Sequence, residues 1–161
     1  TGEWKPNAYV TRAEFAADLA RFAGIHVFYP TDGAAQFSDV DPSSDLAPYI
    51  AWASDSGIVT GFDDGTFRPG RTLTREQMAT IFGRYALKQG IELPKDAAPA
   101  ESFPDADKIS EYAREFVELM RIAGILNGYE DGTFRPQGNA TRAEVATIIM
   151  RYTKLVSGTE N

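Results

Sequence analysis

The chain has 161 residues, of which 43% are hydrophobic and 24% charged, a balance typical of a folded protein with a core. Its 16 Lys and Arg against 23 Asp and Glu give a formal net charge of −7, which disfavours binding to nucleic acid or anionic membranes. No apolar run of roughly 18 residues predicts membrane insertion, and no secretory leader is visible. Zero cysteines and a single histidine, His26, exclude thiol chemistry and sites with two imidazoles. The opening Thr1 in place of Met indicates a processed product or a fragment.

Internal repetition is the most informative feature of the sequence. A G-T-F-R-P turn followed by a T-R pair occupies residues 65–75 and recurs at 132–142. A third copy, with Trp and Lys in its turn, opens the chain at residues 2–12. Each of the two full copies is preceded by an F-x-D segment and a G-I-x-x-G segment, at 37–39 and 57–61 in one copy and at 103–105 and 124–128 in the next.

Two amphipathic helices are predicted in each full repeat. The second follows the T-R pair and carries apolar residues at spacings of four and three, which defines one buried stripe. The first ends at Gly57 or Gly124, where a left-handed cap would stop it. The predicted stripes are Phe15, Leu19 and Phe22, then Met78, Phe82 and Tyr85, then Val145, Ile149 and Tyr152 in the second helices, and Leu46, Ile50 and Ala53, then Ala113, Val117 and Met120 in the first.

A helix pair of this size cannot bury its stripe alone, so neighbouring repeats must pack together. The sequence therefore predicts a mainly α protein of tandem helix–loop–helix repeats around a shared helical bundle, with at most a very short strand or two at the turns. Residues 30–36 and 93–101, rich in Pro, Ala, Asp and Gly, are expected to be connectors. The expected repeats span residues 1–29, 37–90 and 103–158.

The T-R-x-E motif predicts the start of each second helix. Thr11 with Glu14 and Thr141 with Glu144 match the capping box, in which the Thr hydroxyl and the Glu side chain each bind the other residue's backbone N–H. In the middle repeat the partner is Gln77, which the box also allows. Capping explains these residues without a ligand.

The arginine of the motif is not explained by capping. Arg12, Arg75 and Arg142 occupy the first helical position, where the helix dipole disfavours a cation. Two interpretations remain open. The guanidinium and free helix N–H groups could bind a carboxylate or phosphate, or the arginine could pair with an acid of a neighbouring repeat, such as Asp39 or Asp105.

Together, these motifs resemble the S-layer homology (SLH) domains of bacterial surface proteins. The hallmarks are F-S-D-V at 37–40, G-I-V-x-G-F-x-D-G-T-F-R-P at 57–69 and T-R-A-E at 141–144. The resemblance covers two full repeats and the second half of a third. It implies a pseudo-threefold arrangement with grooves between repeats and an extracellular location in the cell wall or S-layer.

By the same resemblance, the grooves bind secondary cell-wall polysaccharide or another peptidoglycan-linked polymer, typically through a pyruvate ketal on N-acetylmannosamine. The T-R-A-E arginine is a principal contact, and the loop after the first helix adds others. Trp52 is either a sugar-stacking platform or a core residue, and Leu119 at the matching position favours the core. The implied ligand-binding residues are Arg12, Arg75 and Arg142, with Thr60, Gly61, Asp63 and Trp52 in one repeat and Asn127, Gly128 and Glu130 in the next.

Other classes of function are weaker. A pair of catalytic carboxylates has no sequence signature, but the recurrent acids resemble turn and cap residues, so we expect no enzyme. No metal or other cofactor is expected, because the twelfth residue from Asp63 is Thr74, where an EF-hand requires Glu. The favoured function is a non-catalytic anchor, and the alternative is a module for protein–protein interaction or lattice assembly, including self-association. Because the first copy begins within the repeat, the number of competent grooves stays open.

Overall fold

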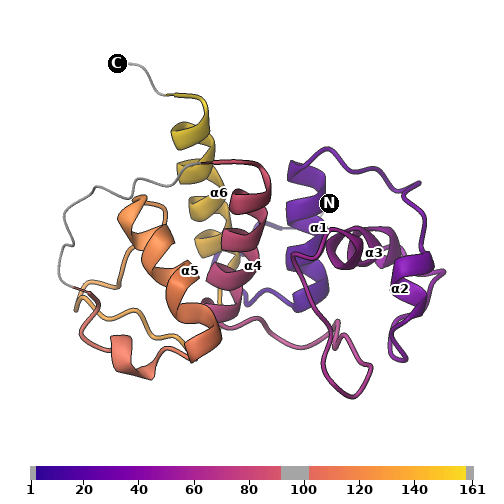
Figure 1. Ribbon diagram of the computed structural model, residues 1–161, viewed down its shortest axis with the longest axis horizontal. Coiled ribbons are helices and arrows are strands. Elements are labelled where there is room, and N and C mark those ends of the chain that lie inside the picture. The colour runs from indigo at the N-terminus through magenta and orange to yellow at the C-terminus, as the bar shows by residue number, and fades with distance from the viewer. Residues whose placement is uncertain (1–2, 92–101, 159–161) are drawn as a thin grey trace. The chain divides into compact units, whose positions relative to one another are not determined.

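The computed structural model describes residues 3–91 and 102–158, so the predicted connector at 93–101 lies outside the described residues. The described ranges contain helices and turns and no regular strand, which confirms the mainly α class. None of their helices has the length and apolarity needed to cross a membrane. In chain order the helices are α1 (Arg12–Phe22), α2 (Asp32–Ala35), α3 (Ala47–Asp55), α4 (Arg75–Lys88), the short 3-10 helix η1 (Ala106–Lys108), α5 (Glu111–Ile122) and α6 (Arg142–Val156) (Figure 1).

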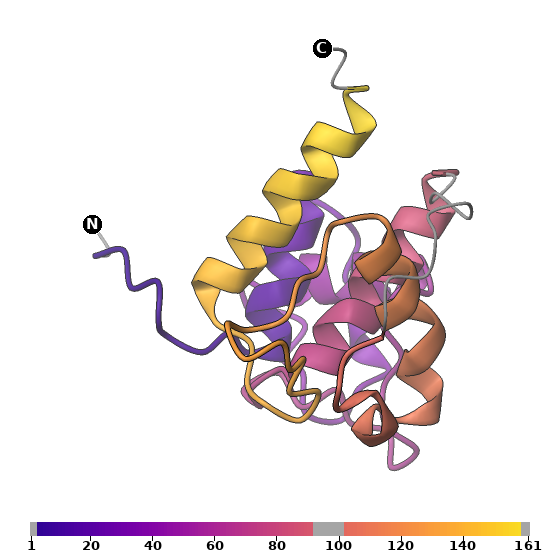
Figure 2. The same cartoon turned by 90° about the vertical axis from the view of Figure 1, so that its left-hand side faces the viewer.

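The chain forms two compact units. One is Val10–Leu73, in which α3 packs against α1 and α2. The other combines Thr1–Tyr9 with Thr74–Asn161, and in it α4 packs along α5 (Figure 2). Tyr152 of α6 joins this second core, with its ring 5.1 Å from that of Phe82 in α4, measured between centroids.

Most of the predicted apolar stripe is buried, with three exceptions. Phe22 is 37% exposed, because α1 ends at that residue. In α6, Ile148 is buried where Ile149 was predicted, and Leu46 is half-buried because it precedes α3 as its N-cap. The buried members are Phe15, Leu19, Ile50, Ala53, Met78, Phe82, Tyr85, Ala113, Val117, Met120, Val145 and Tyr152.

The first helices end as predicted, but one connector differs. Gly57 and Gly124 follow α3 and α5 with φ of 73° and 75°, the left-handed conformation expected of helix caps. The prediction of a simple connector at 30–36 is wrong, because this segment contains α2. Ala34 is fully buried there, and the Gln36 amide donates to Ser54 Oγ of α3 at 2.8 Å.

The start of each T-R helix is held by the turn of a different repeat. The N–H of Arg12 donates to the carbonyl of Arg71 at 2.9 Å, and equivalent bonds run from Arg75 to Gly138 and from Arg142 to Ala8. Isolated bridges accompany these bonds, and the described residues form no regular strand. The order of these bonds is cyclic: the first repeat donates to the turn of the second, the second to that of the third, and the third to that of the first.

Candidate functional site

The arginines of the T-R pairs occupy the first position of their helices, as predicted, but their environments differ. Arg12 is 6% exposed and Arg75 is 4% exposed, whereas Arg142 is exposed. The expectation that free helix N–H groups add to an anion site is wrong. The first N–H of each helix donates to a turn carbonyl, and the N–H of the third residue donates to the capping Thr hydroxyl. Anion binding at these positions would depend on the guanidinium.

The Arg75 guanidinium is bound on several sides. Its Nε donates to the carbonyl of Phe134 at 2.7 Å and its Nη2 to the carbonyl of Asn127 at 3.4 Å. Its Nη1 forms an ion pair with Glu144 at the start of α6. The guanidinium carbon lies 4.5 Å from the centroid of the Tyr129 ring, within cation–π range. These partners fix the guanidinium in one orientation.

A cleft of about 220 Å³ opens at this arginine. Its walls come from α4, from the G-I-x-x-G loop and from the first three turns of α6, all within one compact unit. The lining residues are Arg75, Met78, Leu126, Asn127, Gly128, Tyr129, Ala143, Glu144, Thr147, Ile148 and Arg151.

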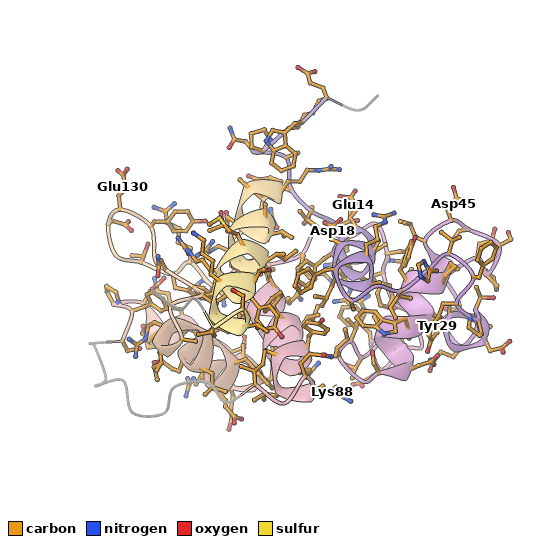
Figure 3. All side chains as sticks on the ribbon, turned by 90° about the horizontal axis from the view of Figure 1, so that it is seen from above. Glu14, Asp18, Tyr29, Asp45, Lys88 and Glu130 are labelled. Atoms are coloured by element: carbon orange, nitrogen blue, oxygen red, sulfur yellow. The ribbon has the colours of Figure 1, made fainter. Side chains whose placement is uncertain are left out.

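Three of the predicted binding residues meet at this cleft, namely Arg75, Asn127 and Gly128. Glu130 does not line it: its side chain is exposed and points away from the helices (Figure 3). Gly128 has a structural reason to be glycine. A Cβ there would lie 2.7 Å from the carbonyl oxygen of Gly132, because the turn closes back on this residue.

Arg12 repeats most of the Arg75 arrangement within the other unit. Its Nε donates to the carbonyl of Phe67 at 2.8 Å and its Nη2 to the carbonyl of Thr60 at 3.4 Å. The ring of Phe62 lies 4.7 Å from the guanidinium carbon. Thr60 therefore contributes its backbone carbonyl, and its loop approaches Arg12 as Asn127 approaches Arg75.

The other predicted residues of this repeat lie elsewhere. Gly61 is half-buried, and a Cβ there would contact the Phe37 ring. Asp63 is exposed in the turn. Trp52 is 9% exposed within α3, so its ring offers little surface to a sugar.

The acids named as alternative partners of these arginines serve the turns instead. The Asp39 carboxylate accepts the backbone N–H groups of Phe67 and Arg68, each at 2.8 Å. Asp105 accepts the equivalent pair in the next repeat at 2.9 and 2.8 Å. The pairing of Arg75 with an acid is present, but the predicted acid was wrong, because Asp39 and Asp105 satisfy turn N–H groups.

Hydrogen bonds also set the ionisation of the turn acids. At Asp131, bonds from the Thr133 hydroxyl and N–H, with help from Arg135, lower the pKa of the carboxyl to about 2. Asp64 has the matching partners, Thr66 and Arg68, and its pKa is lowered too. Both acids are therefore anionic at neutral pH and hold the turn in shape.

Among the cleft residues that sequence reasoning missed, Tyr129, Glu144 and Arg151 carry polar groups that contact one another or the loop. Glu144 was assigned to capping alone, and the Tyr129 hydroxyl donates to it at 3.4 Å. Arg151 donates to the carbonyl of Ile125 at 3.2 Å, and its Nη2 lies 3.2 Å from the Asn127 amide oxygen when that amide is oriented to accept. The signal for Arg151 was its recurrence, since an arginine stands at the matching position of each repeat.

Comparison with known proteins agrees with this architecture of tandem helical repeats. The sequence model of the family described as the S-layer homology domain matches residues 36–79 and 102–146, more than half of the chain. The chain therefore belongs to the S-layer homology domain family, as its motifs predicted. Domains of this family are cell-surface anchoring modules.

Named relatives point the same way. Over 93% of its length the chain is 33% identical to cell surface glycoprotein 1 of Acetivibrio thermocellus and, again over 93%, 31% identical to a cellulosome-anchoring protein of that organism. Over 96% of its length it is 31% identical to an S-layer protein of Bacillus thuringiensis subsp. finitimus. The chain spans only 7%, 33% and 18% of these three relatives, respectively. Family and relatives place it at the bacterial cell surface, which confirms the predicted location.

Proposed function

We propose that the chain is a non-catalytic anchor that binds an acidic secondary cell-wall polysaccharide and so tethers a larger surface protein to the wall. The acidic group is a carboxylate, of which the pyruvate ketal on N-acetylmannosamine is the leading example. The expected repeats at 1–29, 37–90 and 103–158 are the units of this anchor. The names of the relatives, one of them a cellulosome-anchoring protein, support the tethering role.

The cleft at Arg75 carries the proposal. An arginine that is 4% exposed as a residue, yet lines an open cleft of about 220 Å³, suits the recognition of one carboxylate on a larger ligand. The volume is below that of most drug-sized sites, which fits a monosaccharide unit of a polymer better than a whole oligosaccharide. Asn127 and Gly128 are proposed to contact this unit.

Further groups are proposed as secondary contacts. Arg12, with the loop of Thr60 and Gly61, is the equivalent site in the preceding repeat, and Arg142 is the third. The exposed acids Asp63 and Glu130 would meet neighbouring sugar units. Trp52 is left out of the proposed site, because it is 9% exposed and its ring offers little surface to a sugar.

The test is co-sedimentation of the chain with purified walls from a pyruvylating Gram-positive bacterium. Walls stripped of their ketals by mild acid are the comparison. We expect the chain to pellet with intact walls and to remain in solution with stripped ones. Equal pelleting with both would move recognition to the sugar backbone or peptidoglycan, and pelleting with neither would favour a protein partner.

A variant pair sharpens this test. Arg75→Lys keeps a cation opposite Glu144 but removes the planar fork that matches a carboxylate, so pelleting should fall. Arg121→Lys is the matched control, since Arg121 pairs with Glu118 on α5 at 2.7 Å and does not line the cleft. Loss of pelleting in both variants would contradict a role specific to Arg75.

A further inference from the structure

Glu144 departs from the role that its sequence position predicts. At the start of α4, Thr74 and Gln77 form both halves of the capping box. At the start of α6, the Glu144 N–H donates to the Thr141 hydroxyl as expected, but the carboxylate turns to Arg75. The physical reason is that a guanidinium with almost no exposure needs a counter-charge, and a charge-assisted bond is about twice as strong as a neutral one.

The carboxylate is nevertheless within reach of a ligand. Its side chain is 22% exposed, against 5% for Arg75, and both residues line the same cleft. One oxygen faces Arg75, and the other accepts from the hydroxyls of Tyr129 at 3.4 Å and Thr141 at 3.2 Å. Because two hydroxyls already hold it, Glu144 has partners to retain if it leaves the guanidinium.

The donors of Arg75 set up a competition. Its Nε and Nη2 point at the backbone carbonyls of Phe134 and Asn127, which are part of the turn and loop that build the cleft wall. The remaining nitrogen, Nη1, is paired with Glu144. A ligand carboxylate that binds at Nη1 must therefore displace the Glu144 carboxylate.

From this geometry we infer that Glu144 is an internal competitor for the acidic group of the ligand and sets the selectivity of the Arg75 cleft. The inference rests on the proposed function. In the empty cleft Glu144 pairs with Arg75, and on binding the ligand carboxylate replaces it while Glu144 stays on Tyr129 and Thr141. Small anions that offer a charge alone gain nothing from the exchange, so the cleft selects a carboxylate attached to a sugar that adds contacts of its own.

The expected change in affinity depends on the fraction of molecules in which Arg75 is not paired with Glu144. If Glu144 occupies Arg75 in about nine molecules of ten, the apparent dissociation constant of the ligand is about tenfold above the intrinsic value. Glu144→Gln removes the competing charge, so it should tighten binding by about this factor. Gln77 is the natural residue at the matching position and completes its capping box, so Glu144→Gln keeps the helix start. The unpaired Arg75 guanidinium lowers stability, and thermal unfolding measures that loss separately from binding.

The probe is the methyl glycoside of N-acetylmannosamine carrying a pyruvate ketal. Binding is followed by the backbone amide NMR signals of Asn127 and Gly128, which report on this cleft alone. Glu115→Gln is the matched control, since it removes one negative charge from an exposed position on α5 outside the cleft. Thermal unfolding of each variant, together with Glu144→Ala, guards against an effect on folding.

We expect about tenfold tighter binding by Glu144→Gln, tighter binding also by Glu144→Ala, and no change in Glu115→Gln. The advantage should vanish with the methyl ester of the probe, which has no charge to compete. Unchanged or weaker binding in Glu144→Gln, with the probe still shifting Asn127 and Gly128 in the wild type, would overturn the inference and leave the proposed function standing. A probe that shifts neither amide in any variant would overturn both.

Discussion

Arg12 and Arg75 are two copies of one arrangement, and their difference separates what the fold requires from what a ligand requires. In both, Nε donates to the carbonyl of an aromatic turn residue and Nη2 to a loop carbonyl. In both, the guanidinium lies within 5 Å of two aromatic ring centroids. These shared contacts belong to the fold, since each arginine uses them to join its helix to the turn of the following repeat.

The contrast lies in the chemistry added around Arg75. Phe62 in the first arrangement is replaced by Tyr129 in the second, whose hydroxyl reaches Glu144. The residue that matches Glu144 in the preceding repeat is Gln77, which carries no charge. The two sites therefore share one backbone arrangement but differ in the charge and hydrogen-bonding capacity of their side chains. The chemistry of each site can thus vary through its side chains while the turn stays constant.

The largest expected effect comes from removing Arg75, which pairs with Glu144. Arg75→Met leaves the carbonyls of Phe134 and Asn127 and the Glu144 carboxylate without their donor, so the free energy of unfolding should fall by about 3 kcal/mol. Adding Glu144→Gln should recover about 1 kcal/mol, because the unpaired charge is then gone. Urea unfolding of the single and double variants measures both values.

A control for this double-mutant comparison uses Arg12, the equivalent arginine of the first repeat. Arg12→Met combined with Glu144→Gln should show additive losses, since Glu144 is the partner of Arg75. Recovery in the Arg12 pair, or none in the Arg75 pair, would mean that the ion pair does not distinguish the two sites.

The next effect tests the glycines that close the two loops. Gly128→Ala would place a Cβ against the backbone oxygens of Gly132 and Thr133, at 2.7 and 2.9 Å, and should cost about 2 kcal/mol. Gly61→Ala meets the Phe37 ring and should cost a similar amount. Gly70→Ala is the control, because nothing lies within 4 Å of its Cβ and stability should hold or rise slightly. If Gly128→Ala is as stable as the wild type, closure of the turn does not explain this glycine, and contact with a ligand would be the favoured reason.

Much of this arrangement could be predicted, because its causes are local. The apolar spacing of four and three places Phe82 and Tyr85 in the core, and the capping pattern fixes Arg75 as the first residue of α4. The resemblance to the SLH family further predicted Asn127 and Gly128 as groove contacts, and both line the cleft at Arg75. Periodicity and capping act within one or two turns of helix, so a single sequence reports them well.

The remainder depends on contacts that no local pattern records. Glu144 fits the capping box completely in sequence, and only the burial of Arg75 creates the demand that turns its carboxylate away. Asp39 looked free to pair with an arginine, but two turn N–H groups needed an acceptor. The helix α2 is four residues long, too short for an apolar period to appear.

The third effect concerns the helix caps beside the two arginines. Thr11→Ala and Thr74→Ala each remove the hydroxyl that accepts a backbone N–H, at 3.1 Å from Glu14 and 3.3 Å from Gln77. Each should lower the free energy of unfolding by about 1 kcal/mol. The wall-binding assay should be nearly unchanged for Thr74→Ala. A loss of wall binding as large as that of Arg75→Lys would show that the cap acts on the ligand.

The smallest expected effect is on the pH dependence of stability, measured separately for the turns of Asp131 and Asp64. The pKa of Asp131 falls from its ordinary 3.8 to about 2, chiefly through the Thr133 hydroxyl and N–H, and that of Asp64 is lowered by the matching partners. A lowered pKa in the folded state means that the unfolded state binds the proton more readily. The stabilisation is therefore complete above about pH 4 and disappears as the pH falls towards 2.

Asp131→Asn should accordingly lower stability at pH 7 and flatten its decline between pH 4 and pH 2. Asp64→Asn should do the same in the turn beside Arg12. Urea unfolding at pH 7, 4, 3 and 2 measures both. The two acids have equivalent hydrogen-bond partners. If both variants change the slope of stability against pH equally, the acid sensitivity lies in the turn that the two repeats share. A slope that changes only in Asp131→Asn would instead link it to the cleft at Arg75, where the two copies differ.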